Sequence, residues 1–234
     1  MKTKFIVSAV AAAALSCGVS VSSQAAEVSA AVGASNFYLW RGFDLGNGSA
    51  AVWGDLNVSQ DGLYAGVWTS SGDDSFGVEY DLYAGYGGEY EGFTYDLSYW
   101  TYAYPNAKST TADNPDPADR IDDIKPTDIA DVIGSIGYGP VAFTAYLPVA
   151  AGSGDGDFSY FTLGGEYDQY SALLGYHTDD KGALSADAQD YWHLNLGYAY
   201  NDNLAFTVVV PLNDTDSGPQ DPLFNVAVSL PLEF

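Results

Sequence analysis

The side chains of this sequence that could do chemistry are mostly carboxylates, and several of them lie within apolar segments. In residues 76–86, Glu79 and Asp81 alternate with large apolar residues. A period of two is typical of a β-strand with one apolar and one polar face. If the strands surround an interior, carboxylates on the polar face give it a negative potential that favours cations. By parity, that face carries Asp55, Glu79, Asp81, Asp96, Asp131 and Glu166, with Trp53, Asn57, Tyr83 and Asn195 beside them.

Basic and imidazole groups are scarce on these segments. Arg41, at the end of the first predicted strand, is the only cation associated with a strand, and we expect it to face acidic groups across the interior. His177 ends one predicted strand and His193 begins the next, both on the polar face, where they could form a metal-binding or pH-sensing pair. The simpler interpretation, which we favour, is that an apolar exterior excludes these polar groups.

Twelve segments must position these residues, and the lengths of their connections alternate. Short turns such as 60–62 follow the even-numbered segments, whereas long links such as Pro105–Asp128 follow the odd-numbered ones. An even strand count with short periplasmic turns and long external loops is typical of a transmembrane, antiparallel, up-and-down β-barrel, and disfavours a β-sandwich. The predicted strands are 28–40, 51–59, 63–69, 76–86, 93–104, 130–138, 141–149, 158–167, 170–178, 191–200, 204–210 and 224–234.

The last segment, 224–234, has the clearest alternation and ends on an aromatic residue. In a barrel it must pair with the first strand, and Pro231 should loosen that seam because proline cannot donate a ladder hydrogen bond. Phe234 and Leu232 resemble the C-terminal assembly signal of outer-membrane barrels. The parity predicts that lipid contacts Val226, Val228 and Leu230, and that Asn225 and Ser229 face the interior.

Composition bounds the class of protein further. The 234 residues include 19 Tyr and 26 Gly and carry a formal net charge of −24, which argues against a nucleic-acid partner. Residues 1–25 have the basic start, apolar run and small residues of a cleaved secretory signal peptide, so 26–234 form one predicted barrel domain. Cys17 lies in this leader, and lipidation there is an alternative that we do not favour.

Aromatic residues cluster near the ends of the predicted strands, which is typical of the girdles at the two membrane interfaces. The residues near the short turns are Tyr64, Tyr90, Phe93, Tyr138, Tyr167, Tyr170 and Tyr200. Those near the long links are Tyr38, Trp40, Trp68, Phe76, Trp100, Tyr146, Phe158, Tyr176 and Trp192.

The link Pro105–Asp128 is rich in proline and aspartate and has no apolar period, so we expect a solvated loop. Acidic loops can bind Ca²⁺ or Mg²⁺. None of the candidates has EF-hand spacing, and we expect neither a metal nor a cofactor. The candidates are Asp113, Asp116, Asp119, Asp122, Asp123, Asp155 and Asp157.

Three segments resemble the TorF family of proteobacterial outer-membrane proteins, which are classed as porins. They are 36–42 (NFYLWRG), 63–70 (LYAGVWTS) and 79–86 (EYDLYAGY), and the resemblance is closest over the first 100 residues or so. The long acidic link and Ser229, where many barrels have glycine, depart from the pattern. The resemblance implies an outer-membrane barrel and a channel, but no particular substrate.

We therefore expect an outer-membrane channel for passive diffusion of small hydrophilic solutes, with a weak preference for cations. Its partners would be outer-membrane lipid, lipopolysaccharide, the barrel assembly machinery and the solutes themselves. The alternative is a barrel with no open pore and a structural, adhesion or enzymatic role. A barrel lipase needs a serine and a histidine on the lipid-facing side. Both histidines fall on the inner face and no G-x-S-x-G motif is present, so we expect no enzyme, although a carboxylate protease stays open.

Overall fold

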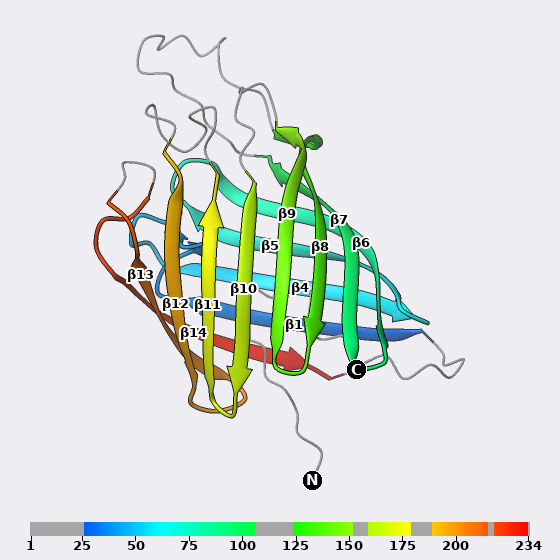
Figure 1. Ribbon diagram of the computed structural model, residues 1–234. Coiled ribbons are helices and arrows are strands. Elements are labelled where there is room, and N and C mark those ends of the chain that lie inside the picture. The colour runs from blue at the N-terminus through cyan, green and yellow to red at the C-terminus, as the bar shows by residue number, and fades with distance from the viewer. Residues whose placement is uncertain (1–25, 106–123, 152–158, 179–188, 215–217, 234) are drawn as a thin grey trace.

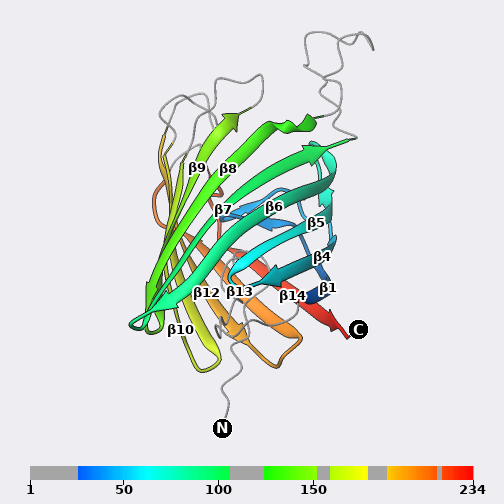
Figure 2. The same cartoon turned by 90° about the vertical axis from the view of Figure 1, so that its right-hand side faces the viewer.

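The regular structure of this protein is a closed β-barrel with a small hairpin inside it (Figures 1 and 2). The computed structural model describes residues 26–105, 124–151, 159–178, 189–214 and 218–233, and in this part of the chain no helix is long and apolar enough to cross a membrane. The strands are β1 (Glu27–Ser35), β2 (Leu39–Trp40), β3 (Phe43–Asp44), β4 (Ala51–Gln60), β5 (Leu63–Asp73), β6 (Gly77–Tyr90), β7 (Phe93–Tyr104), β8 (Ile124–Tyr138), β9 (Val141–Ala151), β10 (Tyr160–Tyr167), β11 (Tyr170–His177), β12 (Tyr191–Ala199), β13 (Leu204–Pro211) and β14 (Leu223–Leu232).

The barrel wall consists of β1 and β4–β14, each strand antiparallel to its neighbours, which confirms the predicted twelve-stranded, up-and-down topology. β1 pairs with β4 on one side and with β14 on the other, so the first and last wall strands close the barrel as predicted. The seam runs from Ala30 opposite Leu232 to Ser35 opposite Ala227, and Pro231 lies opposite Ala31 near its end. The start of β1 and the end of β14 therefore lie at the same end of the barrel as the short turns.

Short turns join β4 to β5 and β6 to β7 with two residues each. Both residues of each turn have positive φ, at Asp61 (52°) and Gly62 (86°) in the first and at Glu91 (50°) and Gly92 (83°) in the second. Positive φ at both central positions matches the twist of the flanking strands, which is why Asp-Gly in a short link is a strong hairpin signal.

The two faces of the wall differ in polarity as the alternation predicts. On β4, the Val52 side chain is 61% exposed, whereas that of Trp53 is 8% exposed and points inward. On β14, Phe224, Val228 and Leu230 are exposed on the outer face, and Asn225 is buried inside. Exposed valine, leucine and aromatic side chains recur on the outer face of most wall strands, which suits a lipid environment.

Three expectations about the strands are wrong. The first predicted strand, 28–40, ends at Ser35, after which the chain leaves the wall. β5 and β6 run further than predicted, to Asp73 and Tyr90. β8 begins at Ile124, so the last residues of the expected loop Pro105–Asp128 belong to a strand; residues 106–123 lie outside the described part.

The chain between β1 and β4 forms a hairpin that we call the inner hairpin (residues 37–44). β2 and β3 pair through Leu39 with Asp44 and through Trp40 with Phe43. The turn between them has positive φ at Arg41 (47°) and Gly42 (92°). Because Arg41 and Gly42 adopt this conformation, the chain reverses directly after the end of the predicted first strand.

The two predicted aromatic girdles are each wrong in part. At the long-link end, Tyr38 and Trp40 belong to the inner hairpin, and Trp100 points inward and is buried; at the short-turn end, Tyr64 is buried inside. Side chains on the inward register cannot reach a lipid interface, whatever their distance from the strand end. The short-turn end does present a ring of exposed aromatic residues, formed by Tyr90, Phe93, Tyr138, Tyr167, Tyr170 and Tyr200.

Candidate functional site

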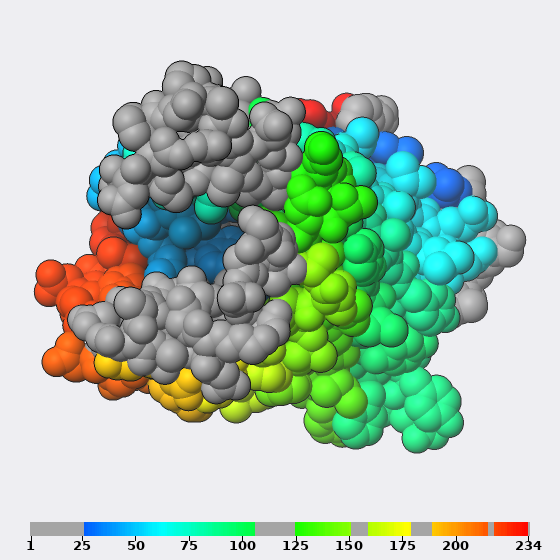
Figure 3. Space-filling model, turned by 90° about the horizontal axis from the view of Figure 1, so that it is seen from above, coloured from blue at the N-terminus to red at the C-terminus, as the bar shows by residue number. Residues whose placement is uncertain are grey.

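The inner hairpin lies across the interior of the barrel and contacts opposite walls. Its residues Phe37, Tyr38 and Leu39 are buried. They and the residues that follow contact β6, β7, β8, β11, β12, β13 and β14. Viewed from above, the blue atoms of this early part of the chain form the floor of the opening (Figure 3).

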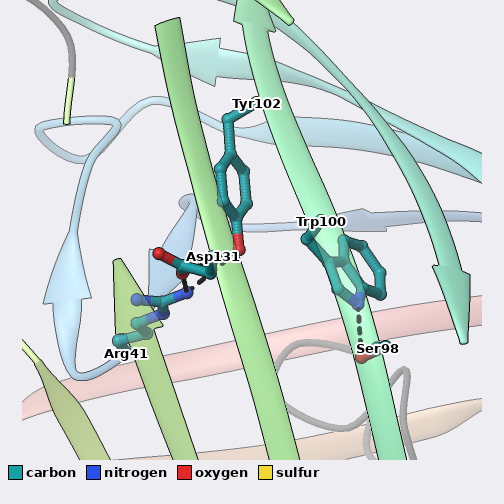
Figure 4. A network of polar contacts seen from close by, with 5 residues as sticks. All are labelled: Arg41, Ser98, Trp100, Tyr102 and Asp131. Atoms are coloured by element: carbon teal, nitrogen blue, oxygen red, sulfur yellow. Dashed lines mark hydrogen bonds and ion pairs between the residues drawn. The ribbon is translucent and has the colours of Figure 1, made fainter. Parts of the chain in front are cut away.

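The tip of the inner hairpin carries the predicted cation, and an acidic group meets it. Arg41 Nη2 lies 2.5 Å from Asp131 Oδ2 on β8 and 3.1 Å from the Tyr102 hydroxyl on β7 (Figure 4). The two charged side chains are only 10% and 8% exposed. The guanidinium carbon also lies 4.5 Å from the centre of the Tyr146 ring, a cation–π distance. Arg41 is therefore held in a polar and aromatic pocket of the wall.

Arg41 stays cationic in this pocket. Burial by itself lowers the pKa of the guanidinium, but the interactions with Tyr102 and Asp131 raise the pKa more, so the net shift is above the ordinary value. A buried ion pair of this kind gains little over an apolar pair but is costly to break on one side only. The contact therefore fixes where the tip lies.

Two histidines, His177 on β11 and His193 on β12, contact the backbone of the tip. His177 Nε2 donates to the carbonyl oxygen of Arg41 at 2.7 Å, and the Gly42 carbonyl accepts from the Tyr191 hydroxyl at 3.5 Å. A side chain at Gly42 would meet the His193 ring within 2.6 Å. The ring centres of the two histidines are 6.1 Å apart. Both side chains are fully buried on the inner face, and they position the hairpin's backbone.

A hydrogen-bond network also fixes the tautomer of His193. Its Nδ1 donates to the Asn195 side-chain oxygen at 2.8 Å, and its Nε2 accepts from the Tyr160 hydroxyl at 3.1 Å. Tyr160 in turn stacks on His177, with ring centres 4.2 Å apart. Both ring nitrogens of His193 therefore have partners in the wall.

Tyrosine hydroxyls donate to several other carboxylates of the inner face. Tyr38, on the inner hairpin, donates to Glu79 at 2.6 Å. Tyr83 donates to Asp55 at 2.9 Å. Burial, followed by the charge of Glu79, raises the pKa of the Tyr38 hydroxyl well above its usual range, so this hydroxyl keeps its proton and donates. Glu79 and Asp55 therefore each have a hydroxyl donor on the inner face.

A cluster of aromatic rings lines the same wall on β5–β8. Tyr83 stacks on Trp100 with ring centres 4.2 Å apart, and both pack with Tyr64 and Ile133. Trp100 Nε1 donates to Ser98 at 3.2 Å (Figure 4). The wall that Arg41 contacts is therefore closely packed with large rings.

The predicted site residues fall into two groups by exposure. Glu79, Asp81 and Asp131 are buried beside the inner hairpin, and Oδ1 of Asp81 has no hydrogen-bond partner among the described residues. The other three carboxylates are partly exposed on the inward register, toward the short turns; these are Asp55, Asp96 and Glu166. Tyr64 donates to Asp96 at 2.8 Å.

Several expectations fall on parts of the chain that the structure leaves undescribed. These are the leader 1–25 with Cys17, the loop aspartates Asp113, Asp116, Asp119, Asp122, Asp123, Asp155 and Asp157, and the terminal Phe234. Leu232 ends β14 and is exposed on the outer face. Within the described ranges, no group of three His, Cys, Asp or Glu residues could hold a metal ion.

The inner hairpin and its tyrosines are what sequence reasoning missed. Tyr38, Tyr102 and Tyr191 contact the hairpin or form part of it, yet they read as ordinary strand residues. One signal was available: Arg41-Gly42 and Asn47-Gly48 are two turn-forming pairs close together. Two such pairs around a short apolar run favour a hairpin over one long strand.

Comparison with known proteins places the chain in a family. No curated protein matches the sequence. A family of bacterial proteins of unknown function, Gcw_chp, matches residues 20–221, which span β1 to β13. This chain therefore belongs to the Gcw_chp family of bacterial proteins of unknown function.

Proposed function

We propose that this protein is a channel in the outer membrane of a Gram-negative bacterium, through which small hydrophilic solutes diffuse passively. The observation that carries the proposal is the division of a twelve-stranded barrel into an apolar outer face and an inner face rich in carboxylates. An apolar band suits lipid, and a polar interior lowers the barrier to hydrated solutes. The resemblance of three segments to the TorF porins supports the same function.

A weak preference for cations follows from the charges on the inner face. Among the described residues there, six predicted carboxylates face one guanidinium, and Arg41 is already paired with Asp131. Asp55, Asp96 and Glu166 remain partly exposed to the interior. Unpaired negative charge in a narrow, low-dielectric passage raises the local concentration of cations.

Conductance of the refolded protein in planar bilayers tests this function. We expect single-channel steps, and a reversal potential under a KCl gradient that has the sign of cation preference. Asp96→Asn should reduce that preference, because it removes one partly exposed inner charge. An anion-selective reversal potential would contradict the assignment of selectivity.

Export and membrane insertion are part of the proposal. Residues 1–25 would act as a cleaved signal peptide, and Leu232 and Phe234 as the signal read by the barrel assembly machinery. The mature barrel would contact outer-membrane lipid and lipopolysaccharide, without catalytic activity, cofactor or metal. Heat-modifiable migration in SDS gels and recovery in the outer-membrane fraction are the expected results, whereas a protein found in the soluble fraction would contradict them.

One observation favours a second candidate, a barrel with a structural or adhesion role and no open pore. The inner hairpin fills part of the interior, and its Phe37, Tyr38 and Leu39 side chains are buried against the walls. If this arrangement is permanent, the folded barrel conducts no ions. The conductance measurement separates the two candidates, provided that a variant without the hairpin is measured as well.

A further inference from the structure

The two ends of the inner hairpin are held by different kinds of contact. At its base, Phe37 and Leu39 pack with Val209 of β13 and Leu223 of β14. Asn225 Nδ2 also donates to the Phe37 carbonyl oxygen at 3.2 Å. Exposing these apolar side chains to water would cost free energy, so the base is the part of the hairpin that should stay in place.

Two polar contacts hold the hairpin against the wall of β6–β8, one at Arg41 in the tip and one at Tyr38, which lies between the two base residues. On the other side, the Phe43 ring packs on the rings of His177 and Tyr191. Arg41 pairs with Asp131 at 2.5 Å, and Tyr38 donates to Glu79 at 2.6 Å. We call these two contacts the latch. Water can replace a hydrogen bond within the protein with a small net change in free energy, but it cannot replace apolar packing. The tip is therefore the part of the hairpin that can be released.

Tight turns make the hairpin a preformed unit. The tip turn has positive φ at Arg41 and Gly42, and the link to β4 has positive φ at Asn47 and Gly48. Asp44 Oδ1 and Oδ2 accept hydrogen bonds from the amides of Gly46 and Gly48, at 2.9 and 2.8 Å respectively. The link thus satisfies its own amides and keeps its shape when the hairpin moves. The carbonyls of Arg41 and Gly42 accept hydrogen bonds from His177 and Tyr191, which water replaces when the tip moves.

The latched state leaves one buried carboxylate oxygen without a partner. Asp81 lies two residues from Glu79 on the inner face of β6 and is 3% exposed. A side-chain hydrogen bond links it to Glu79, but its Oδ1 has no hydrogen-bond partner among the described residues. A buried carboxylate oxygen without a partner gains free energy when water reaches it. Release of the tip from this wall would hydrate Asp81, which offsets part of the loss of the latch.

We propose that the inner hairpin is a gate of the channel, and that Arg41 and Tyr38 latch it shut against Asp131 and Glu79. This inference rests on the proposed channel function. In the open state the tip leaves the wall of β6–β8 and pivots on its apolar base. The passage then runs along the wall that carries Glu79, Asp81 and Asp131, which strengthens the preference for cations. Arg41 is a positioning residue in this mechanism, because it acts through the hairpin.

Single-channel recording of two latch variants and two matched controls tests the gate. Asp131→Asn and Glu79→Gln each weaken one latch contact by replacing a carboxylate with an amide. Asp96→Asn and Asp55→Asn make the same replacement at carboxylates that bond to wall tyrosines. We expect the open probability to rise at least tenfold in both latch variants and to stay within twofold of wild type in the controls, while all four lose some cation preference. An equal rise in latch and control variants would overturn the gate.

A barrel without the hairpin separates failure of the gate from failure of the channel. Residues 37–44 are replaced by a short Gly-Ser linker, and refolding is verified by heat-modifiable migration. We expect a steadily open pore of larger conductance than wild type. Equal conductance and open probability in both proteins would refute the gate and leave the channel function standing. A refolded, hairpin-free barrel that does not conduct would refute the channel function itself.

Discussion

The buried pair of Arg41 and Asp131 gives a prediction whose size can be worked out from its surroundings. Removing one partner of a buried ion pair typically costs about 3–5 kcal/mol, because an uncompensated charge is left in the interior. In Arg41→Met, Asp131 keeps the hydroxyl of Tyr102, which donates to it at 3.1 Å. In Asp131→Leu, the guanidinium keeps the face of the Tyr146 ring. We therefore expect about 3 kcal/mol for either single variant, the lower end of that range.

The double variant should behave differently from the sum of the two. Replacing a whole buried pair with apolar groups of similar volume is often neutral or stabilising. We expect Arg41→Met with Asp131→Leu to cost about 1 kcal/mol or less, against about 6 kcal/mol if the two changes were independent. The difference between these two values is the interaction free energy of Arg41 with Asp131.

Urea unfolding of the refolded barrel in phospholipid vesicles, followed by tryptophan fluorescence, measures these free energies. Asp96→Leu is the matched control, because Asp96 bonds to Tyr64 but is partly exposed to the interior. Single variants that each cost less than about 1 kcal/mol would mean that the pair behaves like an exposed ion pair. That result, or additivity in the double variant, would refute the reasoning.

Three further predictions concern the turns, the membrane face and the hairpin. Gly42→Ala should destabilise the barrel more than Gly48→Ala in the same unfolding assay: both have positive φ and pay about 1–2 kcal/mol, but only at Gly42 would the new methyl group meet a ring. Leu56→Arg, on the outer face at mid-strand, should cost about 2–4 kcal/mol, and Asn57→Arg, on the inner face next to it, clearly less; equal costs would argue against a lipid-facing exterior. Tyr38→Phe removes a buried donor and should cost about 1–3 kcal/mol near pH 8. Because folding raises the pKa of Tyr38, its contribution is complete below the unfolded pKa of 10.0 and falls at higher pH, so the gap between variant and wild type should narrow above pH 10; a constant gap would contradict this.

The wall of the barrel was largely readable from sequence because one physical rule governs it. An apolar outer face and a polar inner face impose an alternation, so parity alone oriented Val52 against Trp53 and Val228 against Asn225. The closure of β14 on β1 followed from the strand count, and the register confirms it. Strand ends were less predictable, because nothing in the alternation marks where a strand leaves the barrel wall.

The sequence predicted many residues of the candidate site but not the contacts between them. Parity identified the inner carboxylates and both histidines, and it set Arg41 against acidic groups. Parity could not identify Asp131 as the partner of Arg41. Asp131 is 90 positions away in the sequence and lies on β8, four wall strands beyond β4. Aromatic residues were the weakest point, since Tyr64 and Trp100 have the composition of a girdle but the register of the interior.

By itself, the sequence determined an antiparallel barrel with twelve wall strands, an apolar exterior and an acidic interior, since these depend on neighbours two positions apart in the chain. Tertiary structure alone decided that residues 37–44 turn inward. The run Phe37–Trp40 suits a strand as well as a buried hairpin, and the choice depends on partners supplied by distant strands. Only the closed barrel brings Glu79, Asp131 and His177 around one short turn, where their contacts hold it in the interior.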